Sequence, residues 1–392
     1  MLEELIHSLG TAPGSVSSLC VSQRIRKLIQ SGRLAAGDPL PSERELATRL
    51  GLARGTVRAA MEDLDRDGLI EGGAKRVRRV AAGGVDGRVL ANTIGIVVAE
   101  PLLGDTPYAQ PGWPSFVQIA ATAATQRASM QSLSVLITAP VDRAVDQILA
   151  ARPGGLVTTF DATSTPFAAQ AIAAIRAAGV RLVAHDDNVD TAPWAGSIDR
   201  VCTDHYVGGR MLAEALLSRG CRKILRIYRM PDRTPFWDRR DAAFEAVHAA
   251  AGLAVLPPVR TPHMSANDNS STASNFELEA RLLMSYLYDA FKADPSIDTI
   301  VASSDRAAYG VAAACRMLGK EPGRDVLIAG YDNSWAAAPE RAMGSCPPAL
   351  TIDKHHDQIG RSLVELLIDR MEGRLPSEPQ TRIVEPTLVA LG

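Results

Sequence analysis

The sequence predicts an α/β protein in which a small basic module precedes a much larger body of doubly wound parallel sheets. From Thr93 onward, short apolar strand-like runs alternate with alanine-rich helical stretches, as in parallel strands joined by helical crossovers. Between Ser22 and Val80, 13 Lys and Arg stand against 8 Asp and Glu. That segment therefore carries +5, which leaves −7 for the rest of a chain whose net charge is −2. A basic module on an acidic body can bind a polyanion locally.

The overall composition is that of a globular protein, with 46% hydrophobic and 22% charged residues. The five cysteines are scattered without metal-ligand spacing, and no convincing cofactor-lysine motif is present. We therefore expect reduced thiols, no metal and no cofactor. The first residues lack the apolar core of a signal peptide, and no run of about 18 apolar residues occurs. These features predict a cytoplasmic protein with no membrane partner.

The chain divides into four parts. We expect a flexible tail over residues 1–14, the basic module over 15–81, a glycine-containing linker over 82–92 and the body over 93–392. So many strand–helix units exceed one comfortable sheet, which predicts two subdomains in the body. Their expected bounds are about 93–190 with 353–375, and about 191–352 with 376–392.

The basic module reads as three short helices. An apolar stripe predicts the first, and Ser42 with Glu45 three residues later forms a capping box that opens the second. The third places an apolar stripe inward and ends near Gly68. The stripe residues are Val21, Ile25, Leu28 and Ile29 in the first helix, and Val57, Ala60, Met61 and Leu64 in the third.

Cations cluster where a nucleic acid could meet the third helix. Arg54 and Arg58 are four residues apart, so they share an exposed face near the start of that helix. A helix that enters the major groove with its N-terminus needs donors at this position. A strand, a Gly72-Gly73 turn and a second strand follow, which predicts a β-wing. Its second strand carries charges suited to phosphates, at Lys75, Arg76, Arg78 and Arg79.

The segment SGRLAAGDPLPSERELATRLGLARGTVRAAMEDLDRDGLIE closely resembles the winged helix-turn-helix of the GntR family, over roughly 60 residues. The resemblance implies a double-stranded operator DNA partner. By position, it implies DNA contacts at Ser42, Arg44, Arg54, Thr56, Arg58, Gly72, Gly73 and Lys75. Ala53 and Gly55 stand where the family commonly has hydroxyl residues, so the operator sequence of relatives does not carry over.

Polar residues follow several predicted strands of the body. Asp186 and Asp332 each end a strand, and Asp305 begins the helix after another. Ligands of open parallel sheets bind beyond the carboxyl ends of the strands. Carboxylates and arginine make paired hydrogen bonds to sugar hydroxyls, and aromatic faces cover the apolar C–H patches. The expected strand runs are 93–99, 133–138, 154–160, 180–186, 223–228, 298–303 and 325–332.

Ordered landmarks, including AAGVRLVAHDD, TIVASSDRAAYGVAAACRMLG and VLIAGYDNSW, make residues 93–392 resemble a LacI/GalR-type effector domain. This resemblance implies a periplasmic-binding-protein-like fold, a homodimer and a ligand cleft between two subdomains. With the GntR-type head, the whole resembles the arabinose-repressor architecture. The implied ligand contacts are Trp113, Phe116, Asp186, Trp237, Arg240, Asp305, Asp332 and Trp335.

Several residues have a plain structural alternative. Asp305 is as well suited to capping the next helix as to ligand contact, and Trp335 could lie in the core. His355 and His356 are adjacent, so on a helix they point apart, which favours a surface role over a metal pair. Ser304 replaces an asparagine common before the cleft aspartate, so we expect a different ligand from that of well-known relatives. Residues 261–277 are polar and are expected to form a surface loop.

These features predict a ligand-responsive transcription regulator, a repressor of carbohydrate-utilisation genes that a sugar-like effector releases. The same architecture could sense a nucleobase, a sugar acid or a sugar phosphate, or could activate transcription. An enzyme is a remote alternative, because doubly wound sheets host many chemistries but no nucleophile elbow, phosphate loop or HExxH motif is present.

Overall fold

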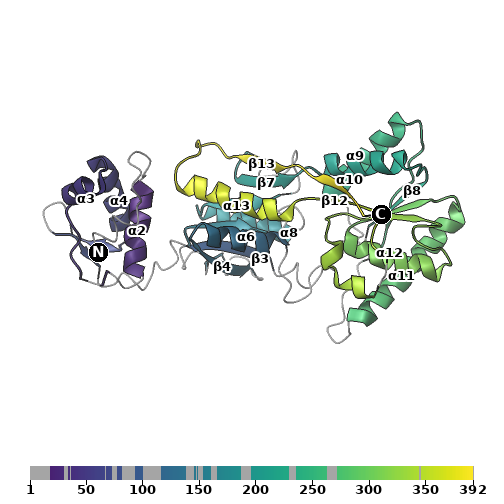
Figure 1. Cartoon of the computed structure of the whole chain (residues 1–392), viewed down its shortest axis with the longest axis horizontal. Coiled ribbons are helices and arrows are strands. Elements are labelled where there is room, and N and C mark those ends of the chain that lie inside the picture. The colour runs from purple at the N-terminus through teal and green to yellow at the C-terminus, as the bar shows by residue number, and fades with distance from the viewer. Residues whose placement is uncertain are drawn as a thin grey trace.

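In the computed structural model, the elements form three successive groups along the chain (Figure 1). These are a small helical head, a first six-stranded sheet with its helices and a second six-stranded sheet with its helices. The structure describes residues 18–30, 34–35, 37–66, 68–72, 77–81, 93–99, 116–137, 145–146, 148, 153–159, 166–186, 196–228, 235–262, 272–343 and 346–391.

The described residues of the head form three helices and a two-stranded antiparallel sheet, as the sequence predicts. Its elements are α2 (Ser18–Gln30), α3 (Glu43–Leu50), α4 (Arg54–Arg66), β1 (Ile70–Glu71) and β2 (Arg79–Val80). Both predicted apolar stripes are buried in one core. The capping box is also confirmed, because the Ser42 Oγ accepts a hydrogen bond from the Glu45 N–H at 3.2 Å. Gly68 follows α4 with a φ of 59°, which suits a glycine after a helix end.

The first sheet has the strand order β13-β7-β6-β5-β3-β4 and is parallel at every described pairing. The helices α6, α8 and α13 belong to this subdomain. The strands are β3 (Thr93–Ala99), β4 (Gln131–Ile137), β5 (Gly155–Thr158), β6 (Leu182–His185), β7 (Asp199–Thr203) and β13 (Thr381–Val384). The helices are α6 (Phe116–Arg127), α8 (Pro166–Ala177) and α13 (His356–Met371).

The second sheet has the order β14-β12-β11-β10-β8-β9, and only the β12–β14 pairing among the described strands is antiparallel. The strands are β8 (Ile224–Tyr228), β9 (Val259–Arg260), β10 (Thr299–Ala302), β11 (Leu327–Ala329), β12 (Leu350–Asp353) and β14 (Thr387–Ala390). The helices are α9 (His205–Ser218), α10 (Pro235–Ala250), α11 (Thr272–Ala293), α12 (Asp305–Met317), η2 (Trp335–Ala337) and η3 (Pro339–Ala342).

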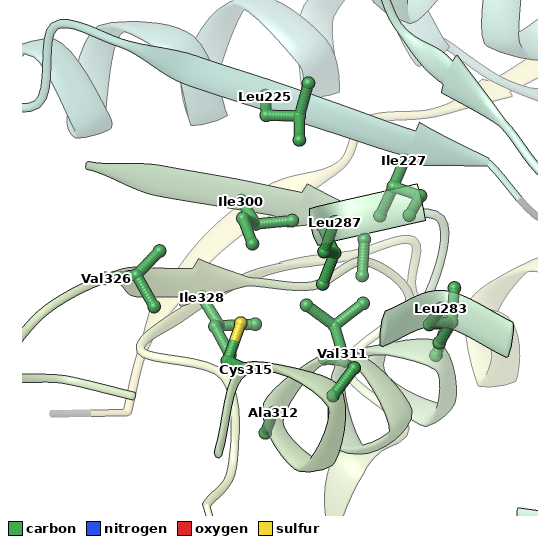
Figure 2. Close-up of a cluster of buried hydrophobic side chains, with 14 of the residues drawn as sticks. Leu225, Ile227, Leu283, Leu287, Ile300, Val311, Ala312, Cys315, Val326 and Ile328 are labelled. Carbon is green, nitrogen blue, oxygen red and sulfur yellow. The ribbon is translucent and has the colours of Figure 1, made fainter. Parts of the chain in front are cut away.

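A layer of aliphatic side chains joins the second sheet to α11 and α12. Figure 2 shows Ile300 and Ile328 of the strands facing Leu287 of α11 and Val311 of α12. All four side chains are at most 3% exposed. Burial of a side chain of this size contributes about 1.5–3 kcal/mol to the stability of the fold. This layer therefore fixes the position of the strands relative to α11 and α12.

The chain passes between the two sheets after β7, after β12 and between β13 and β14. Residues 199–203 and 381–384 therefore belong to the first sheet, whereas the sequence assigned both segments to the second subdomain. The reason is that β13 pairs with β7, a partner far away in sequence. Figure 1 shows this yellow C-terminal strand lying back beside β7.

Two local expectations also change. Residues 261–277 were expected to form a loop, but α11 begins at Thr272. Strands β7, β9, β12, β13 and β14 were not among the expected runs. Among the described residues, none of the helices combines the length and the apolarity that a membrane crossing requires.

Candidate functional site

The exposed side of α4 carries the two predicted arginines. Val57 and Met61 are fully buried, so the opposite side of the helix faces solvent. Arg54 and Arg58 are exposed there, and Thr56 is half-buried between them. The Arg58 Nε lies 2.9 Å from the Glu62 Oε1, with 68% and 50% of the two side chains exposed. An exposed ion pair of this kind contributes little to stability. Arg58 can therefore leave Glu62 and bind another anion.

The start of α3 contributes two more exposed residues, Ser42 and Arg44. The Ser42 hydroxyl is already engaged as the helix cap. Its oxygen can still approach a phosphate, but its position is explained by the helix alone. Arg44 lies in the first turn, and its carbonyl accepts the Thr48 hydroxyl at 2.9 Å. Arg44 therefore presents its guanidinium from a regular, capped helix.

The wing differs from the expectation at Arg78. Its Nη1 lies 2.6 Å from the Glu43 Oε1, and only 16% and 22% of the two side chains are exposed. Arg78 thus ties β2 to α3 instead of pointing towards solvent, which corrects its predicted role as a phosphate contact. Gly72 has a φ of 109°, and an added Cβ would lie 2.9 Å from the Val77 carbonyl oxygen. Gly73, Lys75 and Arg76 lie outside the described residues.

A cavity of about 440 Å³ opens between α6, α13 and the segments that follow β11 and β12. It brings together Phe116 and Asp332, two of the predicted ligand contacts from opposite subdomains. Trp113 lies outside the described residues. The described lining consists of Phe116, Ile119, Ala120, Ala123, Arg127, Asp332, Asn333, Asp353, His356, Asp357 and Arg361. Apolar side chains beside carboxylates and cations are a suitable lining for a ligand that bears both hydroxyls and C–H faces.

Close packing of α6 against α13 builds one wall of this cavity. At Gly360 an added Cβ would lie 2.6 Å from both the Ala120 Cβ and the Val117 carbonyl oxygen, so only glycine allows this approach. The Phe116 ring, 40% exposed, then lies 5.6 Å from the His356 ring, between centroids. An aromatic face is thereby held at the mouth of the cavity.

Asp332 is one of the charged residues that line the cavity. Its Oδ1 lies 3.2 Å from the Nζ of Lys354, which follows β12. Burial opposes ionisation of Asp332, but the positive charges of Lys354, His356 and Arg240 prevail and hold its pKa below the usual range. Asp332 is therefore a carboxylate at neutral pH and can accept two hydroxyl hydrogen bonds.

Arg240 is buried and already well bonded. Its Nε donates to the His205 Nδ1 at 3.1 Å and its Nη1 to the Ser303 carbonyl at 3.0 Å. The guanidinium also lies 3.4 Å from the centroid of the Tyr331 ring. These contacts fix the side chain beside the end of β10.

The two described tryptophans of the predicted site have different surroundings. Trp237 is only 3% exposed and stacks on Tyr228, with centroids 5.0 Å apart and planes at 14°. It is a core residue here, which corrects its expected role as a stacking face. Trp335 is half-buried in η2, with the Arg341 guanidinium 5.4 Å from its ring. The alternative that Trp335 lies in the core is therefore wrong.

Asp186 and Asp305 end up fully buried and bonded to protein groups. Asp186 forms an ion pair with Arg200 at 3.1 Å across the neighbouring strand β7. Asp305 binds a side chain and two backbone amides of the second subdomain. The helix cap of α12 is Ser304, whose hydroxyl accepts the Ala307 N–H at 3.3 Å. Neither carboxylate points into the cavity as expected, and Asp305 is not the cap either.

Two segments of the chain match known protein families. Residues 18–76 match the model of the bacterial regulatory proteins of the gntR family, and residues 213–390 match that of the periplasmic binding protein-like domain. The chain joins a gntR-family helix-turn-helix domain to a periplasmic-binding-protein-like domain. Among the described residues, no group of three or more potential metal ligands accompanies either domain.

Individual relatives match less of the chain. The HTH-type transcriptional regulator CelR of Thermobifida fusca is 24% identical over 192 residues, which are 49% of this chain and 51% of that protein. The chain thus aligns with about half the length of this relative. A CelR–cellobiose complex has a TM-score of 0.58 at 17% identity and covers 90% of this chain and 99% of its own. A lac repressor dimer bound to operator has a TM-score of 0.55 at 19% identity, over 79% and 95% of the two chains. These two structures share the fold.

Sequence reasoning missed Lys354, which pairs with the cavity residue Asp332, and gave His356, which lines the cavity, only a surface role. Lys354 comes directly after β12, and His356 begins α13. Recognition of strand β12 in the sequence would have indicated both residues. Because β12 is parallel to β11, the residues after it lie at the same edge of the sheet as Asp332.

Proposed function

We propose that the protein is a transcription regulator whose gntR-family domain binds operator DNA and whose periplasmic-binding-protein-like domain senses a sugar-like effector. The observation that carries the proposal is the presence in one chain of an exposed arginine face on α4 and of a polar cavity between two subdomains. Residues 18–76, which include α4, match a family of bacterial regulatory proteins, and residues 213–390, which include Asp332 and α13, match a periplasmic binding protein-like domain. We propose that the protein is cytoplasmic, because a transcription regulator acts on DNA in the cytoplasm. We also propose that it is not an enzyme.

On the DNA side, we assign base reading to Arg54 and Arg58, since they lead the exposed face of α4. Ser42, Arg44 and Thr56 are assigned to phosphates or base edges nearby, and Gly72, Gly73 and Lys75 to the wing contact. Two heads are needed for a symmetric operator, so we propose a homodimer, in keeping with the fold shared with a lac repressor dimer bound to operator.

On the effector side, we assign hydroxyl recognition to Asp332 with Lys354, and cover of the C–H face to Phe116. Arg240, whose guanidinium lies over the Tyr331 ring, adds positive charge that favours the ionised form of Asp332. The shared fold with a CelR–cellobiose complex supports a carbohydrate as the ligand. A sugar acid is the second candidate, because Arg127 and Arg361 at the cavity could hold a carboxylate.

The proposed mechanism is allosteric. The effector contacts both subdomains, so it favours the conformation in which the cavity is closed. The segments that pass between the two sheets follow β7, β12 and β13, and they are where the backbone can rotate. Rotation changes the separation of the two heads, and operator affinity falls. We propose release from DNA, and therefore repression of carbohydrate-utilisation genes, as the sign of the response.

The test is a gel shift on DNA selected from a random library by the full-length protein. Cellobiose, glucose, ribose, glucuronate and glucose 6-phosphate are added separately at millimolar concentration. We expect one of the neutral sugars to weaken the complex at least tenfold, and Arg58→Ala to weaken specific binding by about 1–3 kcal/mol. In parallel, a sugar at 100 times its Kd should stabilise the protein by about 2.7 kcal/mol. A chain that selects no DNA sequence, or that responds to none of these compounds, refutes the corresponding half of the proposal.

A further inference from the structure

Asp305, the first residue of α12, has a carboxylate that is enclosed by donors. It is 0% exposed. Its Oδ1 accepts the Thr351 hydroxyl at 2.7 Å. Its Oδ2 accepts the backbone N–H of Ser334 at 2.7 Å and that of Trp335 at 3.2 Å. The carboxylate therefore bonds to β12 and to the turn that follows β11 at the same time.

That turn has an uncommon backbone. Asp332 and Asn333 have φ values of 93° and 50°, in the left-handed region that side-chain-bearing residues rarely adopt. The Asp332 N–H donates to the Ile352 carbonyl at 2.7 Å, and the Asn333 amide donates to the Asp353 carboxylate at 2.9 Å. The two left-handed residues turn the chain so that the next two N–H groups converge on one oxygen of Asp305. The turn is thus held from both of its ends.

The space for this carboxylate depends on a glycine. An added Cβ at Gly330 would lie 2.1 Å from the Asp305 Oδ1. The Asp305 N–H also donates to the Tyr331 carbonyl at 2.8 Å. Consequently, the start of α12 and the end of β11 fit together only with the Asp305 side chain beneath the turn. On the outer side of the turn, the Asp332 carboxylate faces the cavity and Lys354.

We propose that Asp305 is a positioning residue: it holds the Asp332–Trp335 turn so that the Asp332 carboxylate faces the cavity, and it does not touch the effector itself. The hold is geometric. Asparagine can replace aspartate in it, because its oxygen can accept the two N–H groups while its amide donates to the Thr351 hydroxyl. The effector role of Asp332 rests on the proposed function, whereas the hold on the turn does not.

Two measurements on the full-length protein without any effector test the hold. The first is amide hydrogen exchange of the peptide that contains Ser334 and Trp335. The second is competitive acetylation of Lys354 by acetic anhydride, followed by mass spectrometry, because its ion pair with Asp332 protects the amine. We expect Asp305→Ala to accelerate both about tenfold or more, and Asp305→Asn to leave both within about twofold of the wild type. Asp332→Asn should accelerate acetylation alone.

Gly330→Ala provides a second variant in case Asp305→Ala folds poorly. It displaces the carboxylate without removing it, so it should accelerate the same two reactions. Unchanged hydrogen exchange in both variants would overturn the proposal, and so would faster exchange with unchanged acetylation of Lys354. Failure of every sugar to release the wild-type protein from DNA would instead refute the proposed function, and these two ligand-free measurements would still decide what Asp305 does.

Discussion

The buried Asp305 carboxyl makes a sharp prediction about stability and pH. Burial raises its pKa to about 7 from an ordinary value of 3.8. The negative charge of Asp332 raises the pKa further, whereas the three hydrogen bonds to the carboxylate lower it. Between pH 3.8 and 7 the folded protein therefore holds one proton more than the unfolded chain at this position. The free energy of unfolding must then fall as the pH rises through this window, and it levels off above pH 7.

The size of the effect follows from the pKa. Each pKa step of one corresponds to about 1.36 kcal/mol, so the rise to about 7 amounts to about 4 kcal/mol over the whole window. Roughly 2 to 3 kcal/mol of this falls between pH 5 and pH 8. Asp305→Asn keeps the shape and the hydrogen bonds but cannot ionise. Its stability relative to the wild type should therefore increase by that amount from pH 5 to pH 8.

The assay is urea unfolding at pH 5, 6, 7 and 8, followed by circular dichroism and compared between the two proteins at each pH. Asp325→Asn is the matched control. Asp325 is held by Arg324 and has a pKa of about 2, so it stays ionised throughout and its variant should show a constant difference from the wild type. If the difference between Asp305→Asn and the wild type changes by less than about 0.5 kcal/mol from pH 5 to pH 8, the buried carboxyl does not titrate as argued.

Three further predictions concern the head and the cavity. Arg58→Ala should weaken specific operator binding by about 1–3 kcal/mol in a gel shift. Glu62→Gln removes the competing carboxylate, so it should strengthen binding to any DNA by about 2- to 5-fold. Equal binding by the wild type and both variants would contradict the assignment of α4 as the DNA-binding helix. Arg78→Ala should destabilise the head by about 1–2 kcal/mol in thermal unfolding. Arg49→Ala removes an exposed ion pair and should leave the melting curve unchanged. If Arg49→Ala lowers the melting temperature and Arg78→Ala does not, Arg78 is a phosphate contact and not a structural residue. Asp332→Asn should raise the concentration of the releasing sugar at least tenfold with unchanged operator affinity in its absence, and an unchanged dose response would exclude Asp332 from the site.

Local patterns were sufficient for much of the fold. The stripe from Val21 to Ile29, the capping box at Ser42 and the inward face of α4 each depend on residues within one or two helical turns. Such features are dictated by helix geometry, so they can be predicted without knowledge of any partner. The alternation of strands and helices likewise predicted two parallel sheets, and both are present, with β14 as an antiparallel edge strand of the second.

Tertiary structure decided the residues whose role depends on a distant partner. Arg78 is a structural residue because Glu43, 35 positions away, lies within 2.6 Å. Trp237 is a core residue because Tyr228 covers its ring. Asp305 bonds to a turn and a strand that follow it by 29 to 46 positions. No local pattern specifies these distances, because a charged or aromatic side chain is equally compatible with several neighbours until the sheets are assembled.

The sequence by itself determined a basic helical head, a two-sheet body and the carboxylates at the strand ends. Only the tertiary structure decided that Asp332 lines the cavity whereas Asp186 and Asp305 are buried among other protein groups. Asp186 and Asp305 are compensated by Arg200 and by backbone amides, whereas Asp332 meets Lys354 at the cavity edge. The physical reason is desolvation, because a charge that is buried without a ligand must find its partners within the protein.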